Sequence, residues 1–397
     1  MRILFCVNAA PLPPMDGFRL VIDALVHELR QRHEVRVVAF RIADQDERGA
    51  PEYLRLVPQV RRGICVKAGQ FLGASVRRRP LSADVEAAAM RPALHSELRR
   101  FKPDVVHVSS GRLAGLGPDL ERYPRVLAAL DAHHVNVEAK VRVATGLHRL
   151  LLQHETRNVR RFEATAYARF DCVTTVTAAD RDALLRLDPT LRIAVIPNGV
   201  DSARFAPLCV GEPDPSLLVF TGIMRYAPNV TAAQFLAREI LPRVRARRPD
   251  ARLALVGRDP SPSVRDLARL DGVTVTGEVA DLRPWITSCR VYVCPMRDGT
   301  GIKNKLLEAM ACGVPCVATP LAAQGIDGVA GCDLLLAKDA DALADAVVRV
   351  LSDDELARRL ATSARSYVVE RHSWSAVAGA YEEIYRSVQP PTRVSQA

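Results

Sequence analysis

Residues 294–319 read CPMRDGTGIKNKLLEAMACGVPCVAT. An apolar run ends at Pro295, and a loop with two glycines follows it. The pattern then predicts a helix from Ile302 to Cys312, which Gly313 closes and Pro315 keeps from continuing. A buried strand, a glycine-bearing loop and an amphipathic helix in this order are typical of an α/β protein.

One face of this helix is expected to be buried. At about 100° per residue its apolar positions form a single stripe, and Lys303 projects from the top of the same stripe. The side chain of Lys303 is therefore expected to face a crevice and not open water. The stripe consists of Leu306, Leu307, Met310 and Ala311.

The start of the predicted helix carries positive charge. Thr300 is the expected N-cap, and a capping box would place Glu or Gln three residues later, where Lys303 stands. Lys303 and Lys305 occupy the first turn, where the helix macrodipole disfavours each by about 0.3–1 kcal/mol. A ligand phosphate explains this arrangement, because free N–H groups, the dipole and two ammonium groups would all point at it. The alternative is that both lysines are merely solvated.

Composition sets the broad class of the protein. A length of 397 residues favours two domains, and a net charge of +10 favours anionic partners such as nucleotide sugars, acidic lipids or nucleic acid. The 9 cysteines show no CxxC pairing and several lie in apolar strands, so we expect reduced core residues in a cytoplasmic protein. No apolar stretch is long enough to predict a transmembrane helix.

The N-terminal part of the chain reads as a βαβ opening. We expect a buried strand over Arg2–Val7, a helix over Phe18–Gln31 and a second strand over Val35–Phe40. Asp16 and Gly17 precede that helix, at the sheet edge where open α/β proteins place phosphate-bearing ligands. A simple tight turn is the alternative for this glycine.

Two further strands of this half, expected over Asp104–Val108 and Val126–Leu130, are followed by polar residues. The carboxyl ends of parallel strands form the ligand edge of a doubly wound sheet. These polar residues are therefore candidates for contact with a sugar or an acceptor hydroxyl, with hydrogen-bonded structural histidines as the alternative. The candidates are His107, Ser109, His133 and His134.

Residues 44–103 read as irregular and are rich in arginine, with clusters at 61–62, 77–79 and 99–100. Such clusters between apolar residues favour contact with an anionic membrane surface, at about 1 kcal/mol per charge near the lipid. Solvated helix faces are the other interpretation. No aromatic residues are interleaved for base stacking, which argues against a nucleic-acid partner.

The second half repeats the alternation of strands and helices. A strand over Leu217–Thr221 runs into a loop with Gly222 and Arg225, from which a guanidinium can fork onto a diphosphate. Gly257 and Gly277 end the next strands and permit close backbone approach, as where a base or ribose lies against the chain. The chain contains no GxGxxG loop and no GxxxxGK[ST] loop, which argues against nicotinamide or flavin enzymes and NTP hydrolases. It shows no metal-ligand spacing.

These motifs resemble glycosyltransferase family 4, whose fold is called GT-B. Residues 299–315 resemble the family signature, and the IPNGVD turn at 196–201 resembles the one that precedes its linker, here at 205–216. The resemblance implies two Rossmann-like, doubly wound parallel-sheet domains that face each other across a cleft. It places an acceptor-binding domain at 1–205, a donor-binding domain at 206–375, and at 376–397 a helix crossing back to the first domain and a disordered tail.

The same resemblance implies a retaining, metal-independent hexosyltransferase without a cofactor. Its donor is a nucleoside diphosphate sugar, and its acceptor is a hydroxyl group of a saccharide, a lipid-linked glycan or a natural product. The implied location is the cytoplasm, with peripheral contact at the inner face of the membrane. A nucleotide-sugar 2-epimerase of the same fold and a non-catalytic sugar-nucleotide-binding subunit are the alternatives.

Residue roles follow from this resemblance as expectations. Glu308 matches the second glutamate of the family's paired motif, which holds the ribose hydroxyls, and His133 lies near its acceptor-side histidine. Arg225 with Lys303 or Lys305 would neutralise the diphosphate leaving group in place of a metal ion. The remaining donor-binding positions are Gly17, Gly222, Gly257, Val279, Thr300, Gly301, Ile302 and Leu306, and the acceptor side has Asp16, Ser109 and His134.

The chain departs from the family pattern at three positions. The first glutamate of the pair is replaced by Thr300, and the usual Gly-Gly of the first loop by Asp16 and Gly17. The Arg and Lys of the first loop in the C-terminal domain are represented only by Arg225. We therefore expect the lysines of the signature helix to carry more of the phosphate charge.

Overall fold

A computed structural model of the chain describes residues 1–12, 17–41, 50–58, 80–208, 211–299 and 301–390. The chain divides into two compact units. Unit 1 consists of Met1–Ile196 together with Ala378–Ala397, and unit 2 of Pro197–Val377. Residues 197–205, which were predicted to lie in the first domain, belong to unit 2.

Unit 1 is built on a parallel sheet of 7 strands in the order β3-β2-β1-β4-β5-β6-β7. The order reverses between β1 and β4, which makes the sheet doubly wound. The strands are β1 (Arg2–Val7), β2 (Glu34–Phe40), β3 (Leu54–Val57), β4 (Val105–Ser109), β5 (Arg125–Leu130), β6 (Cys172–Thr175) and β7 (Ile193–Val195).

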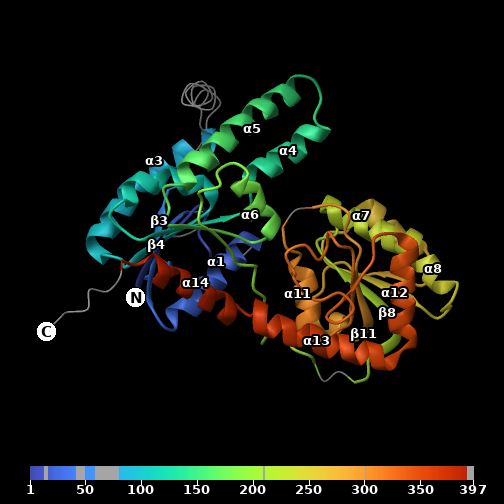
Figure 1. Cartoon of the computed structure of the whole chain (residues 1–397). Coiled ribbons are helices and arrows are strands. Elements are labelled where there is room, and N and C mark those ends of the chain that lie inside the picture. Colours follow the sequence, from blue (N-terminus) through green and yellow to red (C-terminus); the bar gives the residue numbers. More distant parts are fainter. Residues whose placement is uncertain (13–16, 42–49, 59–79, 209–210, 300, 391–397) are drawn as a thin grey trace. The chain divides into compact units, whose positions relative to one another are not determined.

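Helices cover this sheet (Figure 1). They are α1 (Gly17–Arg30), α3 (Leu81–Phe101), the 3₁₀ helix η2 (Gly111–Leu120), α4 (His133–Val143), α5 (Gly146–Tyr167), α6 (Ala178–Leu185) and, at the C-terminus, α14 (Trp374–Val388). From Ala378 onward α14 packs in unit 1, where Tyr385 meets His107 and the Tyr381 hydroxyl lies 3.1 Å from Thr174 Oγ1.

The hydrophobic pattern explains why β1 is an interior strand of the unit 1 sheet. Five consecutive residues, Ile3 to Val7, are completely buried, as expected for a parallel strand covered on both faces. The predicted strands over Arg2–Val7 and Val35–Phe40, and the predicted helix between them, are confirmed to within a residue.

The prediction of an irregular stretch at 44–103 is wrong in two places. Residues Leu81–Phe101 form the helix α3, in which Pro92 interrupts the backbone hydrogen bonding. The buried side of α3 combines Ala83, Ala87 and Ala93 with larger apolar residues such as Met90 and Leu94, and the arginines around them obscured this periodic pattern in the sequence. Leu54–Val57 form the short strand β3 at the sheet edge.

Unit 2 has a second parallel sheet, of 6 strands in the order β10-β9-β8-β11-β12-β13. It also reverses once, between β8 and β11. The strands are β8 (Asp214–Thr221), β9 (Arg252–Val256), β10 (Val273–Val275), β11 (Cys289–Cys294), β12 (Cys316–Ala318) and β13 (Leu335–Leu336). The two doubly wound parallel sheets confirm the predicted fold class.

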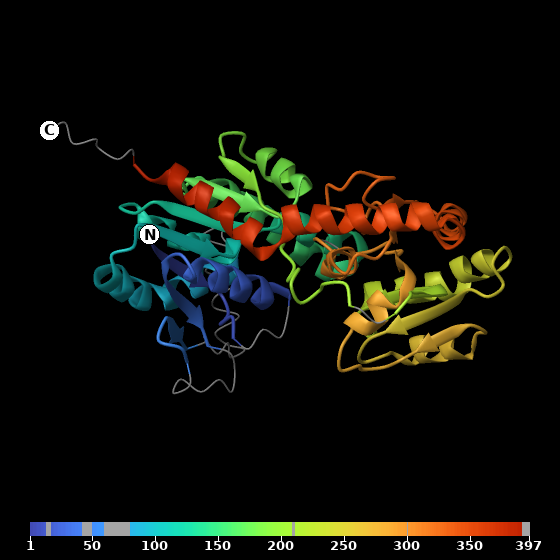
Figure 2. The same ribbon diagram turned by 90° about the horizontal axis from the view of Figure 1, so that it is seen from below.

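Helices lie on both sides of the unit 2 sheet (Figure 2). They are α7 (Ala227–Phe235), the π-helical segment η3 (Leu236–Ile240), α8 (Leu241–Arg245), α9 (Pro262–Arg265), the 3₁₀ helix η4 (Asp266–Arg269), α10 (Arg283–Thr287), α11 (Asn304–Ala311), α12 (Ala340–Ser352) and α13 (Asp354–His372). None of the helices that the structure describes is both long and apolar enough to cross a membrane.

Candidate active site

The strand reversal in unit 2 marks its ligand edge. Loops that leave the carboxyl ends of β8 and β11 diverge to opposite sides of the sheet, which is where open α/β sheets bind ligands. The loop after β8 contains Gly222 and Arg225 and leads to α7, and the loop after β11 leads to α11. Most of the predicted donor-site residues lie on these two connections.

Two glycines let the backbone close tightly beneath this edge. Gly257 has φ +145°, and a Cβ there would lie 1.9 Å from the carbonyl oxygen of Gly222. Gly257 thus makes a close backbone approach to Gly222 that any side chain would prevent. A Cβ at Gly277 would meet nothing within 4 Å, so the space above that residue is open.

Lys305 is held in place by Asn229. Its Nζ donates a hydrogen bond of 2.5 Å to Asn229 Oδ1 and lies 4.6 Å from the ring centroid of Phe220. The amide of Asn229 donates in turn to the Ile223 carbonyl at 3.0 Å, which ties α7 to the loop after β8. A Cβ at Gly222 would lie 2.9 Å from Lys305 Nζ, so this glycine makes room for the ammonium group.

Lys303 is also buried, as the helical stripe predicted, with 7% of its surface exposed. Its Nζ donates to the carbonyl oxygens of Gly299 at 3.2 Å and Gly301 at 2.7 Å. The predicted N-cap is wrong: α11 begins at Asn304 with Lys303 as its N-cap, and no side chain caps that end. The loop glycines fold the chain back over Lys303, which delays the helix by two residues; Thr300 itself lies outside the described residues.

The pKa values in this cluster reflect burial of charge. Burial lowers the pKa of Lys305 to about 8 and that of Lys303 below its ordinary value, against a smaller opposing effect of Cys294. Lys305 donates to a neutral amide oxygen, and among the described residues no carboxylate forms an ion pair with it. A buried ammonium group in such surroundings gains stability when an anion binds beside it.

Glu308 follows Lys305 by three residues on α11 and is half-buried. Burial raises the pKa of its carboxyl, while Lys305 and Arg204 lower it. The carboxylate therefore lies within electrostatic reach of both cations but makes no ion pair with either within the described part of the chain. Its oxygens are suited to accept hydrogen bonds from ligand hydroxyls.

Arg225 is the exposed cation of the site. Its Nε lies 3.5 Å from Asp259 Oδ2, and 72% of its side chain is exposed. Arg225 thus lies on the loop after β8, as predicted from the sequence, and forms a weak pair with Asp259 away from the lysine cluster.

The remaining predicted donor-site residues differ in accessibility. Leu306 is completely buried and Ile302 nearly so, which leaves their backbone and not their side chains for ligand contact. Gly301 has φ +71° and an open side, and Val279 lies half-buried on the loop after β10.

Unit 1 has its own reversal point, between β1 and β4. Asn8, after β1, donates through Nδ2 to Ser110 Oγ at 3.3 Å, and among the described residues its buried Oδ1 has no hydrogen-bond partner. Ser110 has φ +108°, an unfavourable conformation for a residue other than glycine. The buried hydroxyl of Ser109 likewise lacks a partner in the described chain. Strain and unsatisfied polar atoms gather at this edge, as they often do at functional sites.

Glu163 on α5 organises the predicted histidines. Its carboxylate accepts from the backbone N–H of His133 at 2.7 Å and lies 2.6 Å from His134 Nδ1, so it caps the start of α4. His134 is buried with Glu163 and has a structural position. His133 is only half-buried, and burial lowers the pKa of its ring, with Glu163 opposing this effect.

His107 is not at the ligand edge. Its ring is completely buried, stacks on Phe5 at a centroid distance of 4.3 Å, and bonds Tyr385 through Nδ1 at 2.7 Å. The prediction that His107 contacts a sugar is wrong. The residue lies in the middle of β4 and not after its carboxyl end, so its side chain is packed in the core. Gly17 begins α1, while Asp16 lies outside the described residues.

The structure thus brings the predicted residues together in two groups. Gly222, Gly257, Lys303, Lys305 and Glu308 gather in unit 2. His133, His134 and Ser109 lie at or just after neighbouring strand ends in unit 1.

The positioning residues Asn229 and Glu163 were not predicted from the sequence. The Pro-Asn pair at the start of α7 could have indicated Asn229 from the sequence. No local pattern indicates Glu163, because it lies 30 residues from His133, its partner. The described residues contain no cluster of three potential metal ligands.

Comparison with known proteins bears on these groups. Residues 15–204 match the family model described as Glycosyltransferase Family 4, and residues 215–353 match the one described as Glycosyl transferases group 1. A phosphatidyl-myo-inositol mannosyltransferase of Mycolicibacterium smegmatis is 37% identical over 204 residues, which cover 49% of this chain and 51% of the relative. An alpha-maltose-1-phosphate synthase of the same organism is 31% identical over 260 residues, covering 57% of this chain and 65% of the relative.

The chain therefore spans between 51% and 65% of the length of these two curated relatives. Among solved structures, HepE of Anabaena in complex with UDP superposes with a TM-score of 0.67 over 98% of this chain and 100% of that chain, at 15% sequence identity. At this identity the likeness concerns the fold alone.

Proposed function

The chain belongs to glycosyltransferase family 4 and has the GT-B type of fold, and on this premise we propose that it transfers a sugar from a nucleoside diphosphate sugar to a hydroxyl group with retention of configuration. Unit 2 would bind the donor and unit 1 the acceptor. The observation that carries this proposal is the pair of ammonium groups at the strand reversal of unit 2, where Lys303 is buried and Asn229 positions the half-buried Lys305.

The buried lysines suit a diphosphate leaving group. As the bond from the anomeric carbon to the diphosphate breaks, the bonding electrons go to the departing oxygen, whose negative charge Lys303 and Lys305 would stabilise. Arg225, on the adjacent loop, would add a third cation. The acceptor oxygen forms the new bond to the anomeric carbon, and its proton passes to the departing diphosphate. No metal ion is required for this charge balance.

Glu308 is proposed to hold the ribose of the donor. A half-buried carboxylate can accept from two vicinal hydroxyls, and the cations Lys305 and Arg204 favour its ionised form. The backbone of Gly301 and Ile302 and the open face of Gly277 are proposed to line the same site, with Val279 beside the base.

His133, Ser109 and the strained Ser110 are proposed to bind the acceptor. These groups are neutral hydrogen-bonding partners, which fits a polyhydroxyl acceptor. The resemblance to a phosphatidyl-myo-inositol mannosyltransferase leads us to propose a polyol or lipid-linked acceptor. The complex of HepE with UDP makes UDP the first nucleotide to test.

A cytoplasmic location with peripheral membrane contact is also a proposal. The buried free cysteines support a reducing compartment, since burial raises the pKa of Cys6 to about 12 and keeps its thiol protonated. The arginine clusters at 61–62 and 77–79, on which the sequence argument for membrane contact rested, lie outside the described residues.

Thermal unfolding in the presence of UDP, GDP, ADP, dTDP and their sugars tests the donor site, because a ligand that binds only the folded state raises the midpoint. We expect Glu308→Ala to weaken nucleotide binding, and Lys305→Ala to weaken it below pH 8 and to lower turnover as well. Lys338→Ala, which removes an exposed lysine of the same unit, is the matched control. Unchanged binding and turnover in both site variants would refute the assignment. Donor consumption without an acceptor would instead indicate an epimerase.

A further inference from the structure

The helices α4 and α5 form a hairpin whose tip is apolar and exposed. Both run outward side by side from unit 1 and join at residues 144–145 (Figure 1). Val143 is 83% exposed, Leu147 72% and Leu150 62%, and Leu151 is 45% exposed. Four large apolar side chains within nine residues form a contiguous exposed patch, which is unusual on a soluble surface. We call these four residues the hairpin tip.

The same face of α5 becomes basic farther from the tip. At about 100° per residue, Leu147, Leu150, Leu151, Arg157 and Arg161 fall within about 120° of one another around the helix. The two arginines lie about 10–16 Å farther along the helix axis than Leu150, at about 1.5 Å per residue. The face therefore changes from apolar to cationic along its length.

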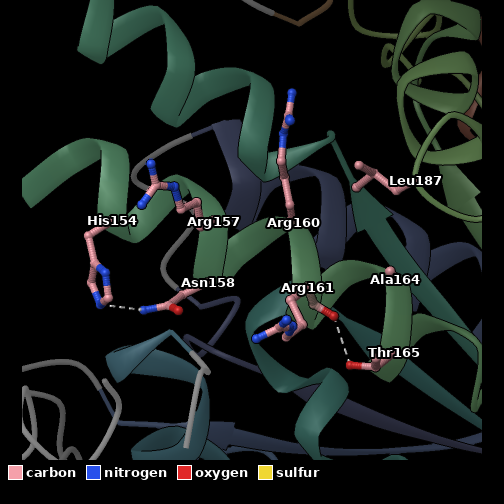
Figure 3. A pocket seen from close by; sticks show the side chains of 8 residues that line it. All are labelled: His154, Arg157, Asn158, Arg160, Arg161, Ala164, Thr165 and Leu187. Carbon is pink, nitrogen blue, oxygen red and sulfur yellow. Dashed lines mark hydrogen bonds between the residues drawn. The ribbon is translucent and has the colours of Figure 1, made fainter. Parts of the chain in front are cut away.

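An open pocket of about 740 Å³ lies at the cationic end of this face (Figure 3). It is lined by His154, Arg157, Asn158, Arg160, Arg161, Ala164, Thr165 and Leu187. Arg160 is paired with Glu138 at 2.7 Å, so its charge is already compensated. Arg157 and Arg161 are exposed, and no carboxylate of the described chain pairs with either. Their charges remain available to an external anion.

Acidic residues are absent from the end of the hairpin. Residues 140–151 include Lys140, Arg142 and Arg149 and contain no Asp or Glu. The acidic residues elsewhere in the hairpin are paired or at least partly buried. Glu138 forms an ion pair with Arg160, Glu163 is buried with His134, and Glu155 is half-buried. The apolar patch is thus bordered by positive charge alone.

We propose that the α4–α5 hairpin docks unit 1 on an anionic lipid bilayer, with the hairpin tip in the boundary of the acyl chains and the arginines of α5 among the headgroups. A helix with an apolar end and a basic flank is the arrangement that binds anionic membranes, and stable binding takes both an apolar and an electrostatic contribution. The long stems of Lys140, Arg142 and Arg149 allow their charges to reach the headgroups while the leucines insert.

Charge complementarity favours a bilayer over a second copy of the chain. Two identical tips would bring Lys140, Arg142 and Arg149 of each copy together without any acidic partner, which is repulsive. This surface lies within unit 1 and uses none of the residues proposed for donor binding. The docking therefore stands independently of the proposed transferase activity.

Flotation of the full chain with vesicles of phosphatidylcholine alone, or of phosphatidylcholine with about one-third phosphatidylglycerol, tests this proposal. We expect binding to the anionic vesicles that weakens with salt. The double variant Leu147→Gln/Leu150→Gln should reduce the partition coefficient by at least about tenfold. Arg157→Ala/Arg161→Ala should reduce it by about tenfold at low salt and less at high salt.

Val329→Gln is the matched control for the apolar variant, because Val329 is an exposed apolar residue of unit 2. Circular dichroism and nucleotide-induced thermal shifts report whether each variant is folded, and neither depends on lipid. Failure of the parent to float with any vesicle, or equal flotation of the hairpin variants, would overturn the proposal. A change of oligomeric state in the leucine variant without a change in flotation would also overturn it and assign the tip to self-association.

Discussion

Replacing Lys305 by methionine removes the buried charge while it keeps most of the side-chain volume. Burial holds the pKa of Lys305 at about 8 in the folded chain, against an ordinary value of 10.5. The difference corresponds to about 3 kcal/mol at about 1.4 kcal/mol per pH unit. The buried charge therefore lowers the free energy of unfolding of the parent by this amount at every pH at which the lysine is protonated in both the folded and the unfolded state.

The sign of the pH dependence follows from the order of the two pKa values. Between about pH 8 and pH 10.5 the unfolded chain binds the proton more tightly than the folded chain, so the free energy of unfolding of the parent rises with pH. The Lys305→Met variant lacks this group. We expect the unfolding free energy of the variant minus that of the parent to fall by about 3 kcal/mol over this range. Loss of the hydrogen bond to Asn229 lowers the free energy of unfolding of the variant equally at all pH values. It therefore does not change the expected pH dependence of the difference.

Tryptophan fluorescence during urea unfolding measures this difference in unit 2 alone, because both tryptophans of the chain, Trp285 and Trp374, belong to that unit. Lys338→Met is the control and should show the same pH dependence as the parent. Parallel curves for Lys305→Met and the parent would refute the argument that the ammonium group is buried and strained.

Nucleotide affinity should follow the same protonation. A bound diphosphate favours the ammonium form of Lys305, so binding above pH 8 requires uptake of a proton. The dissociation constant of the nucleotide diphosphate should therefore rise about tenfold per pH unit above pH 8 in the parent and much less in Lys305→Met. Isothermal titration calorimetry at pH 7.5 and pH 9 checks this expectation.

Three further predictions follow from the contacts. Gly222→Ala places a Cβ 2.7 Å from Asn229 Nδ2 and should weaken nucleotide binding by at least about tenfold in calorimetry, whereas Gly379→Ala, whose Cβ would meet nothing within 4 Å, should not. Glu163→Ala removes the carboxylate that caps α4 and should lower the unfolding free energy by about 2–4 kcal/mol in urea titrations, with nucleotide binding retained. Burial lowers the pKa of His107 to about 3, so on acidification the unfolded ring gains its proton before the folded ring does. The free energy of unfolding of the parent should therefore fall by about 3 kcal/mol between pH 7 and pH 4.5. That of His107→Phe should fall less, as urea titrations at the two pH values can show.

Local patterns were sufficient to predict the two sheets and the buried face of the helix that carries Lys303. Continuous apolar runs indicated β1 and β8, and the stripe on α11 indicated that Lys303 is buried. Such features depend on neighbours within one helix turn or one strand, so the sequence displays them directly. The start of α11 was misplaced because the fold of the loop over Lys303 depends on glycine conformations that spacing does not specify.

Long-range pairings could not be predicted in the same way. The contact between Glu163 and His134 joins α5 to α4, and that between His107 and Tyr385 joins residues 278 positions apart. The residues near these positions in the sequence do not indicate the partners, because the pairings depend on how α14 and the hairpin pack. For the same reason His107 was predicted to lie at a ligand edge that it does not reach.

The two units differ in the kind of ligand that their reversal points can accept. In unit 2 the edge presents buried ammonium groups, whose protonation is weakened by burial and restored by an anion. In unit 1 the edge presents Asn8, Ser110 and a half-buried His133, whose ring burial keeps neutral near pH 7. A charged diphosphate gains most from the first edge, whereas a neutral hydroxyl compound loses little by entering the second. We therefore propose that one type of doubly wound sheet provides an anion site in unit 2 and a neutral polar site in unit 1, and that the residues that follow the strands decide which of them is formed.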